Sequence, residues 1–289
     1  KLSNSETKYL TILGYWLKPA IYKMKKWIEF NLLVWVSLMI TDAKSQTTPK
    51  IYQAPFLTEK IVVDGIPDSA WNAAEWSDLF IDIRGEDYEK PAWDTKVKMM
   101  WDEEALYILA WLEEPHIWAY LENRDDIVFR DNDFEVFVKP DPSTEHYFEY
   151  EINARNTLLD LLMTKPYNKG GKAILTWNSP AISHAVGLEG TLNDPSDIDR
   201  GWWVEIRLPY HDISHHGSDI APGEGRSWTI NFSRVQWQTT VEDGKYVKVK
   251  DENGRNVPED NWVWTPQHVI NMHVPEHWGT VQFVKKRMN

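Results

Sequence analysis

Two neighbouring segments of the chain carry carboxylates at a spacing that could place them around one ligand. In an extended strand, successive side chains point to opposite faces. Asp133 and Glu135 therefore share one face of their strand, and Glu149, Glu151 and Asn153 share one face of the next. The prolines between the two segments suggest a loop that joins a hairpin. We therefore expect Glu135 to lie near Glu149 or Glu151.

Carboxylates that face each other across a β-ladder repel, so something must offset their charge. Solvent, an arginine, a cation or sugar hydroxyls that donate hydrogen bonds could do so. Arg155, Arg207 and Arg234 are the nearest plausible counter-charges. The acids also fit the hydrated face of an exposed sheet, so a structural interpretation stays open beside a binding one.

Paired carboxylates also raise the possibility of glycoside hydrolysis, in which one group acts as acid and the other as base or nucleophile. Two of Glu135, Glu149 and Glu151 would have to serve, but the sequence marks none of them for a special role. A Gly-x-Ser-x-Gly segment and a glycine-rich phosphate loop are both missing, so acyl and phosphoryl transfer lack support. A non-catalytic function is therefore preferred to an enzyme.

Metal ligation has weaker support in the sequence. His268, His273 and His277 are spaced by five and four residues, which matches no zinc signature. Asp131 and Asp133 are the calcium candidates, although the glycine and distal glutamate of an EF-hand loop are missing. A structural calcium ion stays an alternative, and no other cofactor is required.

The chain contains 17 tryptophans, and all but Trp16, Trp27 and Trp35 follow residue 45. An indole is a flat apolar plate that can cover a sugar ring or fill a core. Most of these indoles are expected to be buried, and a surplus is expected to face a ligand. Those that flank the polar loop 243–255 are the best candidates for ligand contact, because mobile loops often carry function. They are Trp237, Trp262 and Trp264, whereas Trp101, Trp111 and Trp228 are expected in the core and Trp93 fits either place.

Charge excludes two classes of partner. The net charge is −13 and becomes −17 without residues 1–45, which hold seven lysines and three acids. Such a surface repels nucleic acid and anionic lipid. The chain has no cysteine, which excludes disulfides and thiolate metal sites.

The N-terminal region predicts export. From Met24 the chain has a basic segment, an apolar stretch of about a dozen residues and a small-x-small site at Ala43 and Ser45. The apolar stretch is short for a membrane span, which needs about 20 residues. We therefore expect residues 24–45 to be a signal peptide, residues 1–23 to be an upstream segment, and the rest to be secreted or periplasmic. An N-terminal anchor that stays in the membrane is the alternative.

Residues 46–289 are predicted to form a single all-β domain. Short alternating runs separated by turn residues are typical of antiparallel sheets with one buried face. The clearest pairs are 96–101 with 106–112 and 134–138 with 147–152, and residues 60–63 are a further such run. Residues 68–74 can form one helical turn with Asp68 as N-cap. The pattern favours a two-sheet antiparallel β-sandwich, of immunoglobulin-like or jelly-roll type with long loops, over a barrel.

The order of short motifs resembles carbohydrate-binding module family 9, in its bacterial family 9-like branch, over most of the chain after residue 45. The motifs are Val63-Asp64-Gly65-Ile66-Pro67-Asp68-Ser69-Ala70-Trp71, Trp101-Asp102-Glu103-Glu104-Ala105-Leu106-Tyr107, Asp133-Phe134-Glu135-Val136-Phe137-Val138, Trp203-Val204-Glu205-Ile206-Arg207-Leu208-Pro209-Tyr210, Gly223-Glu224 with Trp228-Thr229-Ile230-Asn231-Phe232, and His273-Val274-Pro275-Glu276-His277-Trp278-Gly279. Each motif is short, and the six together in this order predict the fold.

The resemblance implies a β-sandwich that holds a sugar between two aromatic plates while a carboxylate and amides bind its hydroxyls. The implied acid is Glu135. The plates fall near Phe129 and Met272, where the family has tryptophan, and its basic residue falls on Glu151. Trp262, Trp264 and Trp278 are candidates to replace the plates. The resemblance also implies calcium in some members, and related sandwiches hold haem through methionine, here Met99 or Met272.

Together these observations predict a secreted, non-catalytic carbohydrate-binding domain that serves polysaccharide breakdown, with any hydrolase on a separate polypeptide. The predicted ligand-binding residues are Glu135, Phe129, Trp237, Trp262, Trp264, Glu151 and Met272. The alternatives are a scaffold without a sugar site, a glycosidase and a haem redox domain.

Overall fold

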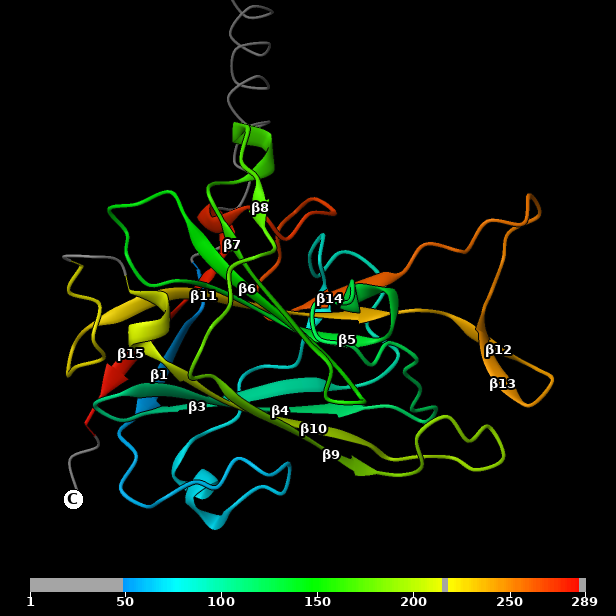
Figure 1. Ribbon diagram of the computed structural model, residues 1–289, viewed down its shortest axis with the longest axis horizontal. Coiled ribbons are helices and arrows are strands. Elements are labelled where there is room, and N and C mark those ends of the chain that lie inside the picture. The colour runs from blue at the N-terminus through cyan, green and yellow to red at the C-terminus, as the bar shows by residue number, and fades with distance from the viewer. Residues whose placement is uncertain (1–48, 215–217, 286–289) are drawn as a thin grey trace, which may run out of the picture. The chain divides into compact units, whose positions relative to one another are not determined.

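The computed structural model describes residues 49–214 and 218–285 (Figure 1). The chain divides into two units, of which the second, Pro49–Asn289, contains all of these residues. The predicted upstream segment and signal peptide lie outside the described residues. Within the described part, no helix is long and apolar enough to cross a membrane.

The larger sheet, here called sheet A, has nine strands. They are β1 (Ile51–Pro55), β2 (Ile81–Asp82), β5 (Asp133–Lys139), β6 (Tyr147–Asn153), β7 (Leu158–Met163), β8 (Ala173–Ile174), β11 (Ser227–Gln236), β14 (Asp260–Val263) and β15 (Gly279–Val284). The main order is β1-β15-β11-β5-β6-β7-β8, and β14 pairs with both β11 and β2. The β1–β15 pair is parallel and the other pairs of this sheet are antiparallel.

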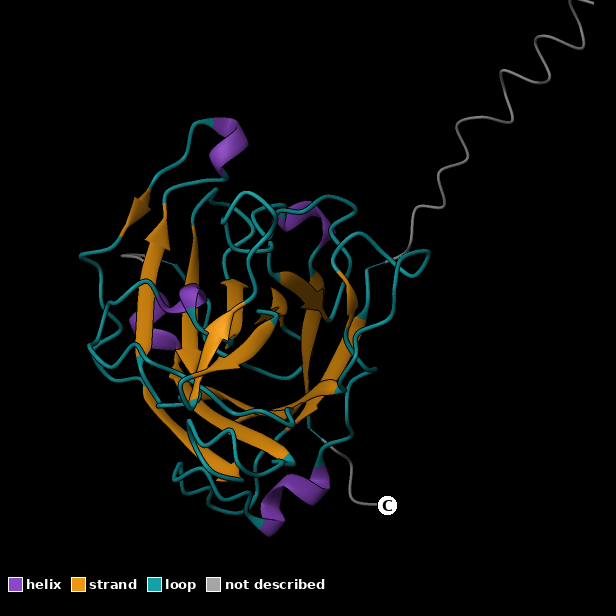
Figure 2. Cartoon of the chain, turned by 90° about the vertical axis from the view of Figure 1, so that its right-hand side faces the viewer, coloured by secondary structure: helices purple, strands orange, loops and turns teal. Residues whose placement is uncertain are grey.

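The smaller sheet, sheet B, is antiparallel with the order β3-β4-β10-β9. Its strands are β3 (Thr95–Trp101), β4 (Ala105–Glu113), β9 (Ser183–Glu189) and β10 (Gly201–Pro209). A separate hairpin joins β12 (Thr239–Glu242) and β13 (Lys245–Lys248). The short 3-10 turns are η1 (Ser69–Ala73), η2 (Val128–Arg130), η3 (Tyr167–Lys169), η4 (Tyr210–Ile213) and η5 (Pro275–His277), and Figure 2 shows how few helical turns accompany the strands.

The main core lies between the two sheets, because alternate residues of each strand point into it. Phe134, Val136 and Val138 of β5 belong to the same buried cluster as Ile108 and Ala110 of β4. The predicted all-β sandwich is therefore confirmed. Both predicted hairpins are present, and Glu135 pairs directly with Glu151 in the register of β5 and β6.

Trp101 and Trp228 lie in this core as expected, but Trp111 does not. Trp111 is half-buried and packs against Trp203, with ring centroids 4.5 Å apart. The reason is the pleat, since the neighbours Ala110 and Leu112 occupy the core face of β4. The half-buried Trp76 stacks on Trp203 at 6.2 Å and continues this row of indoles.

The run 60–63 is not a strand. Backbone N–H groups of this run and of the residues after it donate to side chains instead of to a neighbouring strand. The Val62 N–H donates to Asp68, and the N–H groups of Asp64 and Gly65 donate to Glu205. Asp68 is therefore at the N-cap position of η1 without capping it. Gly65 is required here, because it has a φ of +85° and a Cβ would lie 2.6 Å from the Gly187 nitrogen.

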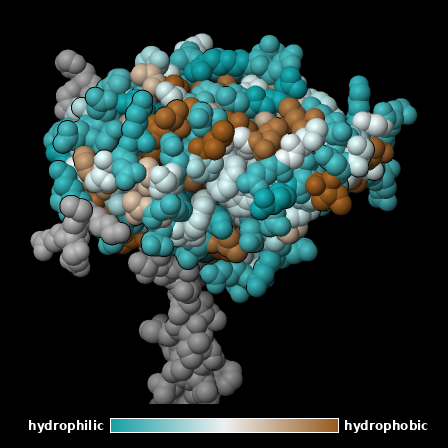
Figure 3. All heavy atoms as spheres, turned by 90° about the horizontal axis from the view of Figure 1, so that it is seen from below, coloured by the Kyte–Doolittle hydropathy of each residue, from teal (hydrophilic) through white to brown (hydrophobic). Residues whose placement is uncertain are grey.

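Glu205 on β10 fixes this segment against the outer face of sheet B. Its carboxylate also accepts the Trp71 indole N–H at 2.9 Å, and Trp71 packs into a cluster with Met100 and Leu109. Burial raises the pKa of Glu205, although the three N–H donors act in the opposite direction. The face on which this segment lies is seen in Figure 3, where brown hydrophobic patches alternate with hydrophilic surface.

A further buried cluster covers the opposite face of sheet A and is here called the outer cluster. Its members are Ile83, Val128, Phe137, Tyr147, Leu159, Leu161, Met163, Val263, Met272 and Trp278. They come from four strands of the sheet and from loops around residues 83, 128 and 272. Sheet A is therefore buried on both faces in this region, so the hydrated face that the sequence allowed is absent here.

We expect Glu205→Ala to lower the free energy of unfolding by about 2–4 kcal/mol, because three N–H donors lose their acceptor in a buried site. Chemical denaturation measures this change. Glu189→Ala is the matched control, since Glu189 also accepts an indole N–H, from Trp203, but its side chain is 31% exposed. Equal losses in the two variants would contradict the anchoring role of Glu205.

His273 predicts a pH dependence of stability. Its Nδ1 lies 2.8 Å from the Tyr147 hydroxyl, and burial lowers the pKa of His273 from 6.5 to about 4. The unfolded chain therefore binds an extra proton between these values, so stability falls as the pH falls from 6.5 to 4. Relative to the wild type, His273→Phe should remove on the order of 2 kcal/mol of this loss.

Urea denaturation at pH 7 and at pH 4.5 measures the difference. His268→Asn is the control, since His268 is exposed and its φ of +61° suits asparagine. A pH dependence that is the same in His273→Phe and in the wild type would contradict the assignment.

Candidate functional site

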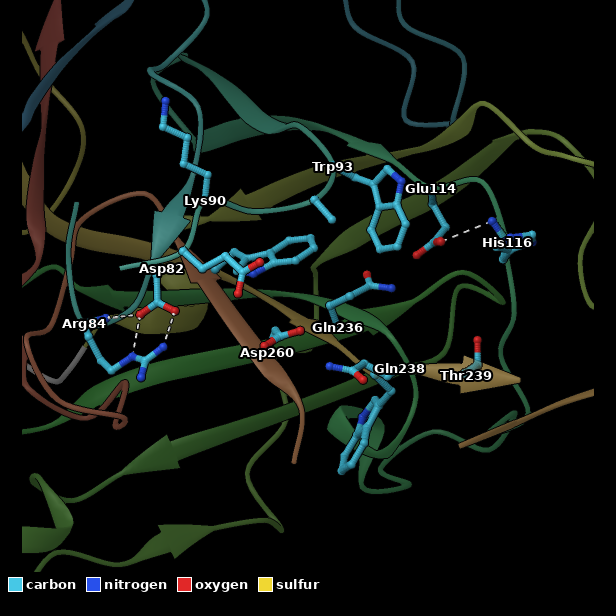
Figure 4. A pocket seen from close by; sticks show the side chains of 14 residues that line it. Asp82, Arg84, Lys90, Trp93, Glu114, His116, Gln236, Gln238, Thr239 and Asp260 are labelled. Atoms are coloured by element: carbon cyan, nitrogen blue, oxygen red, sulfur yellow. Dashed lines mark hydrogen bonds and ion pairs between the residues drawn. The ribbon is translucent and has the colours of Figure 1, made fainter. Parts of the chain in front are cut away.

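A pocket of about 410 Å³ opens at one end of the sandwich, where both sheets contribute to its walls (Figure 4). Sheet A contributes β2, β14 and the end of β11, and sheet B contributes the chain just before β3 and just after β4. The lining residues are Asp82, Arg84, Glu89, Lys90, Ala92, Trp93, Glu114, His116, Gln236, Trp237, Gln238, Thr239, Asp260 and Trp262. Its volume falls in the range of small-molecule sites.

Three indoles line the pocket, and they differ in how much of each ring is free. Trp262 is 5% exposed, with the Arg234 guanidinium 5.0 Å from its ring and Trp93 6.1 Å away at 52°. Trp237 is half-buried and has the Lys248 ammonium 3.3 Å from its ring centroid. Trp93 packs against the main core on one side, so it is a half-buried lining indole, and its ring carries no cation among the described residues.

Acids and amides surround these rings. Asp82 accepts two hydrogen bonds from the Arg84 guanidinium, both at 2.8 Å. Burial alone would raise the pKa of Asp82, but these bonds and the charge of Arg84 outweigh it and lower the pKa. Burial and the charge of Asp82 raise the pKa of Asp260 across the pocket. Figure 4 shows Gln236 and Asp260 between this ion pair and Trp93, with Gln238 below them.

Arg234 holds the wall behind the pocket. It is 1% exposed and donates to Glu114 at 3.0 Å, to Gln236 at 2.9 and 2.7 Å, to the Thr95 hydroxyl at 3.0 Å and to the Glu113 carbonyl at 2.8 Å. These partners belong to β11, β3 and β4 and to the residue after β4. One side chain therefore joins the two sheets directly behind the pocket.

We expect Arg234→Met to lower the free energy of unfolding by about 3–5 kcal/mol, because it leaves the buried Glu114 carboxylate without its charge partner. Glu114→Gln in the same background should recover part of this loss, since the buried charge is then removed. Denaturation of the two single variants and the double variant measures the coupling. Additive losses would contradict a buried ion pair between these residues.

The structure places the predicted ligand-binding residues in three different environments. Trp237 and Trp262 line the pocket. Phe129 is 41% exposed beside it, and its carbonyl accepts the Trp237 indole N–H at 2.9 Å. Trp264 is 2% exposed in the main core, where its ring occupies the space that a side chain at Gly279 would need.

Glu135, Glu151 and Met272 are not among the residues that line the pocket, and all three are buried. Met272 packs in that cluster, and its carbonyl accepts the Trp278 indole N–H. Phe129 is tied to this region, since its N–H donates to Glu151 at 2.9 Å. Of the two plates and the acid that the resemblance implied, Phe129 is therefore exposed, whereas Met272 and Glu135 are buried.

None of the three arginines considered as counter-charges pairs with these acids. Arg155 pairs with Glu122, Arg207 with Glu104 and Arg234 with Glu114. The sequence could not reveal this, because each pairing depends on which face of its element the arginine occupies.

The two calcium candidates, Asp131 and Asp133, have different surroundings. Asp131 accepts the N–H groups of Tyr120 and Leu121 and the Asn153 amide, so it serves to fix the chain before η2. Asp133 has no such hydrogen bonds and groups with Glu135 and Glu151.

The histidines and methionines do not converge on one centre. His273 contacts Tyr147, whereas His277 hydrogen-bonds the Gln267 carbonyl at 2.7 Å. Met99 lies in the main core and Met272 in the outer cluster. The haem alternative would therefore require one of these methionines to leave a packed environment.

The described residues therefore form an all-β sandwich with an aromatic and polar pocket at one end. The chain matches the model of the carbohydrate family 9 binding domain-like family over residues 63–286, and it belongs to this family. No curated protein matches it.

Solved structures share the fold at low sequence identity. A candidate carbohydrate-binding protein from Bacteroides uniformis ATCC 8492 is 15% identical, with a TM-score of 0.59 over 82% of this chain and 100% of that one. A family 9 module from Caldicellulosiruptor kristjanssonii in complex with cellotriose is 17% identical, with a TM-score of 0.52 over 83% and 96% of the two chains. Its complex with glucose gives a TM-score of 0.53 over 83% and 98%, again at 17% identity.

Sequence reasoning missed most of the polar pocket. It did not single out Asp82, Arg84, Glu114, Gln236 or Asp260, and it left Trp93 undecided. The Asp-x-Arg spacing of residues 82 and 84 was a weak signal, since a carboxylate can bind an arginine two residues on. The remaining residues come from segments far apart in the chain, which no local pattern connects.

Proposed function

We propose that this chain is a non-catalytic carbohydrate-binding module and that its sugar site is the pocket beside Trp93. The observation that carries the proposal is the combination of half-buried indoles with fixed carboxylates and amides in the lining of one pocket. The family and the sugar complexes of its structural neighbours support a carbohydrate as the ligand.

The pocket offers both kinds of contact that a sugar ring needs. The C–H face of a pyranose can pack on the Trp93 indole, which contributes apolar contact without much loss of side-chain freedom. Gln238 supplies an amide and Gln236 an NH2 group, since the Gln236 oxygen accepts from Arg234, and Asp82 is held by Arg84 in one orientation. These groups can bind hydroxyls, which both donate and accept.

The acids named for hydrolysis are poorly placed for it. Glu135, Glu149 and Glu151 are each at most 5% exposed, so a glycosidic bond does not reach them in this structure. In the pocket, Glu114 is engaged by Arg234 and Asp82 by Arg84. The arrangement therefore favours binding over catalysis.

The proposal extends to the setting in which binding occurs. We infer that the chain is exported and serves polysaccharide breakdown together with a hydrolase. The basic and apolar segment from Met24 and the acidic composition support export. Fractionation of cells that produce the chain from Met24 tests this part independently of sugar binding.

We expect Trp93→Ala to weaken sugar binding about tenfold or more, because the ring supplies the apolar plate. A glycan array identifies the ligand, and calorimetry with glucose or cello-oligosaccharides measures the affinity. Trp76→Ala is the matched control, since Trp76 is a half-buried indole on the outer face of sheet B, away from the pocket.

Three outcomes are distinguishable. Loss of binding in Trp93→Ala alone supports the pocket. Loss in Trp76→Ala alone moves the site to the row of indoles on sheet B. No binding by the wild type to any glycan on the array would contradict a carbohydrate-binding function.

A further inference from the structure

Four carboxylates lie together on the face of sheet A that the outer cluster covers. They are here called the acid cluster and consist of Asp133 and Glu135 of β5 and Glu149 and Glu151 of β6. Each is at most 5% exposed, and Glu135 faces Glu151 directly across the ladder. Like charges in this arrangement repel, and burial removes the water that would screen them.

The described residues supply no cation to offset this repulsion. No lysine or arginine in that part of the chain forms an ion pair with a member of the acid cluster. The donors that reach the acid cluster are few. They are the Phe129 N–H on Glu151, the Ser233 hydroxyl near Glu135 and the Val235 N–H near Asp133. Burial and the neighbouring carboxylates together raise the pKa of each of Asp133, Glu149 and Glu151.

Asp133 gives an observation that is independent of the clustering. It is fully buried, and neither carboxylate oxygen has a hydrogen bond of ordinary geometry within the described residues, where the Val235 N–H is the one backbone donor that lowers its pKa. One carboxylate oxygen of Glu149 is also buried without a hydrogen-bond partner within the described residues. Buried polar atoms in native proteins are nearly always satisfied, so an orphaned carboxylate indicates a partner other than a side chain or amide of this chain.

The geometry fits a metal ion. One oxygen from each of Asp133, Glu135 and Glu151 can be chosen so that all three lie within 4.8 Å of one another. Ca²⁺ binds oxygen at about 2.3–2.6 Å, so two of its ligands lie at most about 5 Å apart. The ligand set contains only oxygen, which favours a hard cation over zinc or copper.

We propose that Asp133, Glu135 and Glu151 bind one divalent cation, with Ca²⁺ the ion that best fits the oxygen spacing. Glu149 stands behind them as a carboxyl that hydrogen-bonds Glu151. The ion would replace the missing counter-charge and satisfy the orphaned oxygens of Asp133. It would also fix η2, because Glu151 binds the Phe129 N–H. This site is separate from the pocket beside Trp93.

Titration of metal into the chelator-treated protein tests the proposal. Native mass spectrometry should find one bound Ca²⁺, and millimolar Ca²⁺ should raise the Tm by about 5 °C. Mg²⁺ and Mn²⁺ are tested in parallel, and a larger rise with either would keep the site but change the ion. Failure of all three ions to bind and to raise the Tm would overturn the proposal.

The variant Asp133→Asn tests whether the Ca²⁺ response comes from this site, because it removes one proposed ligand. Without metal, the variant should be at least as stable as the wild type, because one of the mutually repelling charges is gone. With Ca²⁺, its rise in Tm should disappear. Glu189→Gln, an acid on sheet B, should keep the full rise, and an equal rise in Asp133→Asn and in the wild type would also overturn the proposal.

Two further variants keep the test decisive. If Asp133→Asn does not fold, the double variant Glu135→Gln/Glu151→Gln should show the same loss of the Ca²⁺ response. Trp93→Ala should retain the response, so failure of sugar binding and failure of metal binding are distinguished. Retention of the Ca²⁺ response in the double variant would contradict these ligands.

Discussion

The buried guanidinium of Arg234 is the interaction on which the two-sheet arrangement around the pocket depends. It belongs to β11 of sheet A and binds groups on β3, on β4 and just beyond β4. A charge with 1% exposure is tolerated only when it is paired and its N–H groups are satisfied. Arg234 meets both conditions and also lies over the Trp262 ring. The position of the pocket wall therefore follows from the pairing of one side chain.

The two faces of sheet A differ in whether a buried charge has a counter-charge from the chain. On its inner face, Arg234 and Glu114 neutralise each other within the chain. On its outer face, the acid cluster has no counter-charge from the described residues, and loops cover it with apolar side chains. The first arrangement is complete in itself. The second lacks a counter-charge among the described residues, which is the reason for the proposed cation.

The family pattern describes the scaffold better than it describes the site. Glu205, in one of the matching motifs, binds Gly65 and Trp71 of another, so this pair of motifs is explained by packing. The residues that correspond to the family's plates and acid lie at the outer cluster or beside it. Phe129 and Met272 stand where tryptophans would form a slot, and Met272 is packed away. The open aromatic pocket is found instead at the end of the sandwich.

The sequence by itself determined the all-β class and the two main hairpins, because alternation and turn residues are local. It placed Glu135 near Glu149 or Glu151, and only the structure fixed the register that pairs it with Glu151. It also indicated the excess of indoles. Only the tertiary structure decided which indoles face the pocket and whether the acids are wet or buried. Trp93, Asp82 and Gln236 meet from three distant segments, and residues near 83, 128 and 272 close over the acid cluster. Whether a face is buried depends on which distant segment packs on it. The alternation of residues along a strand does not predict that segment.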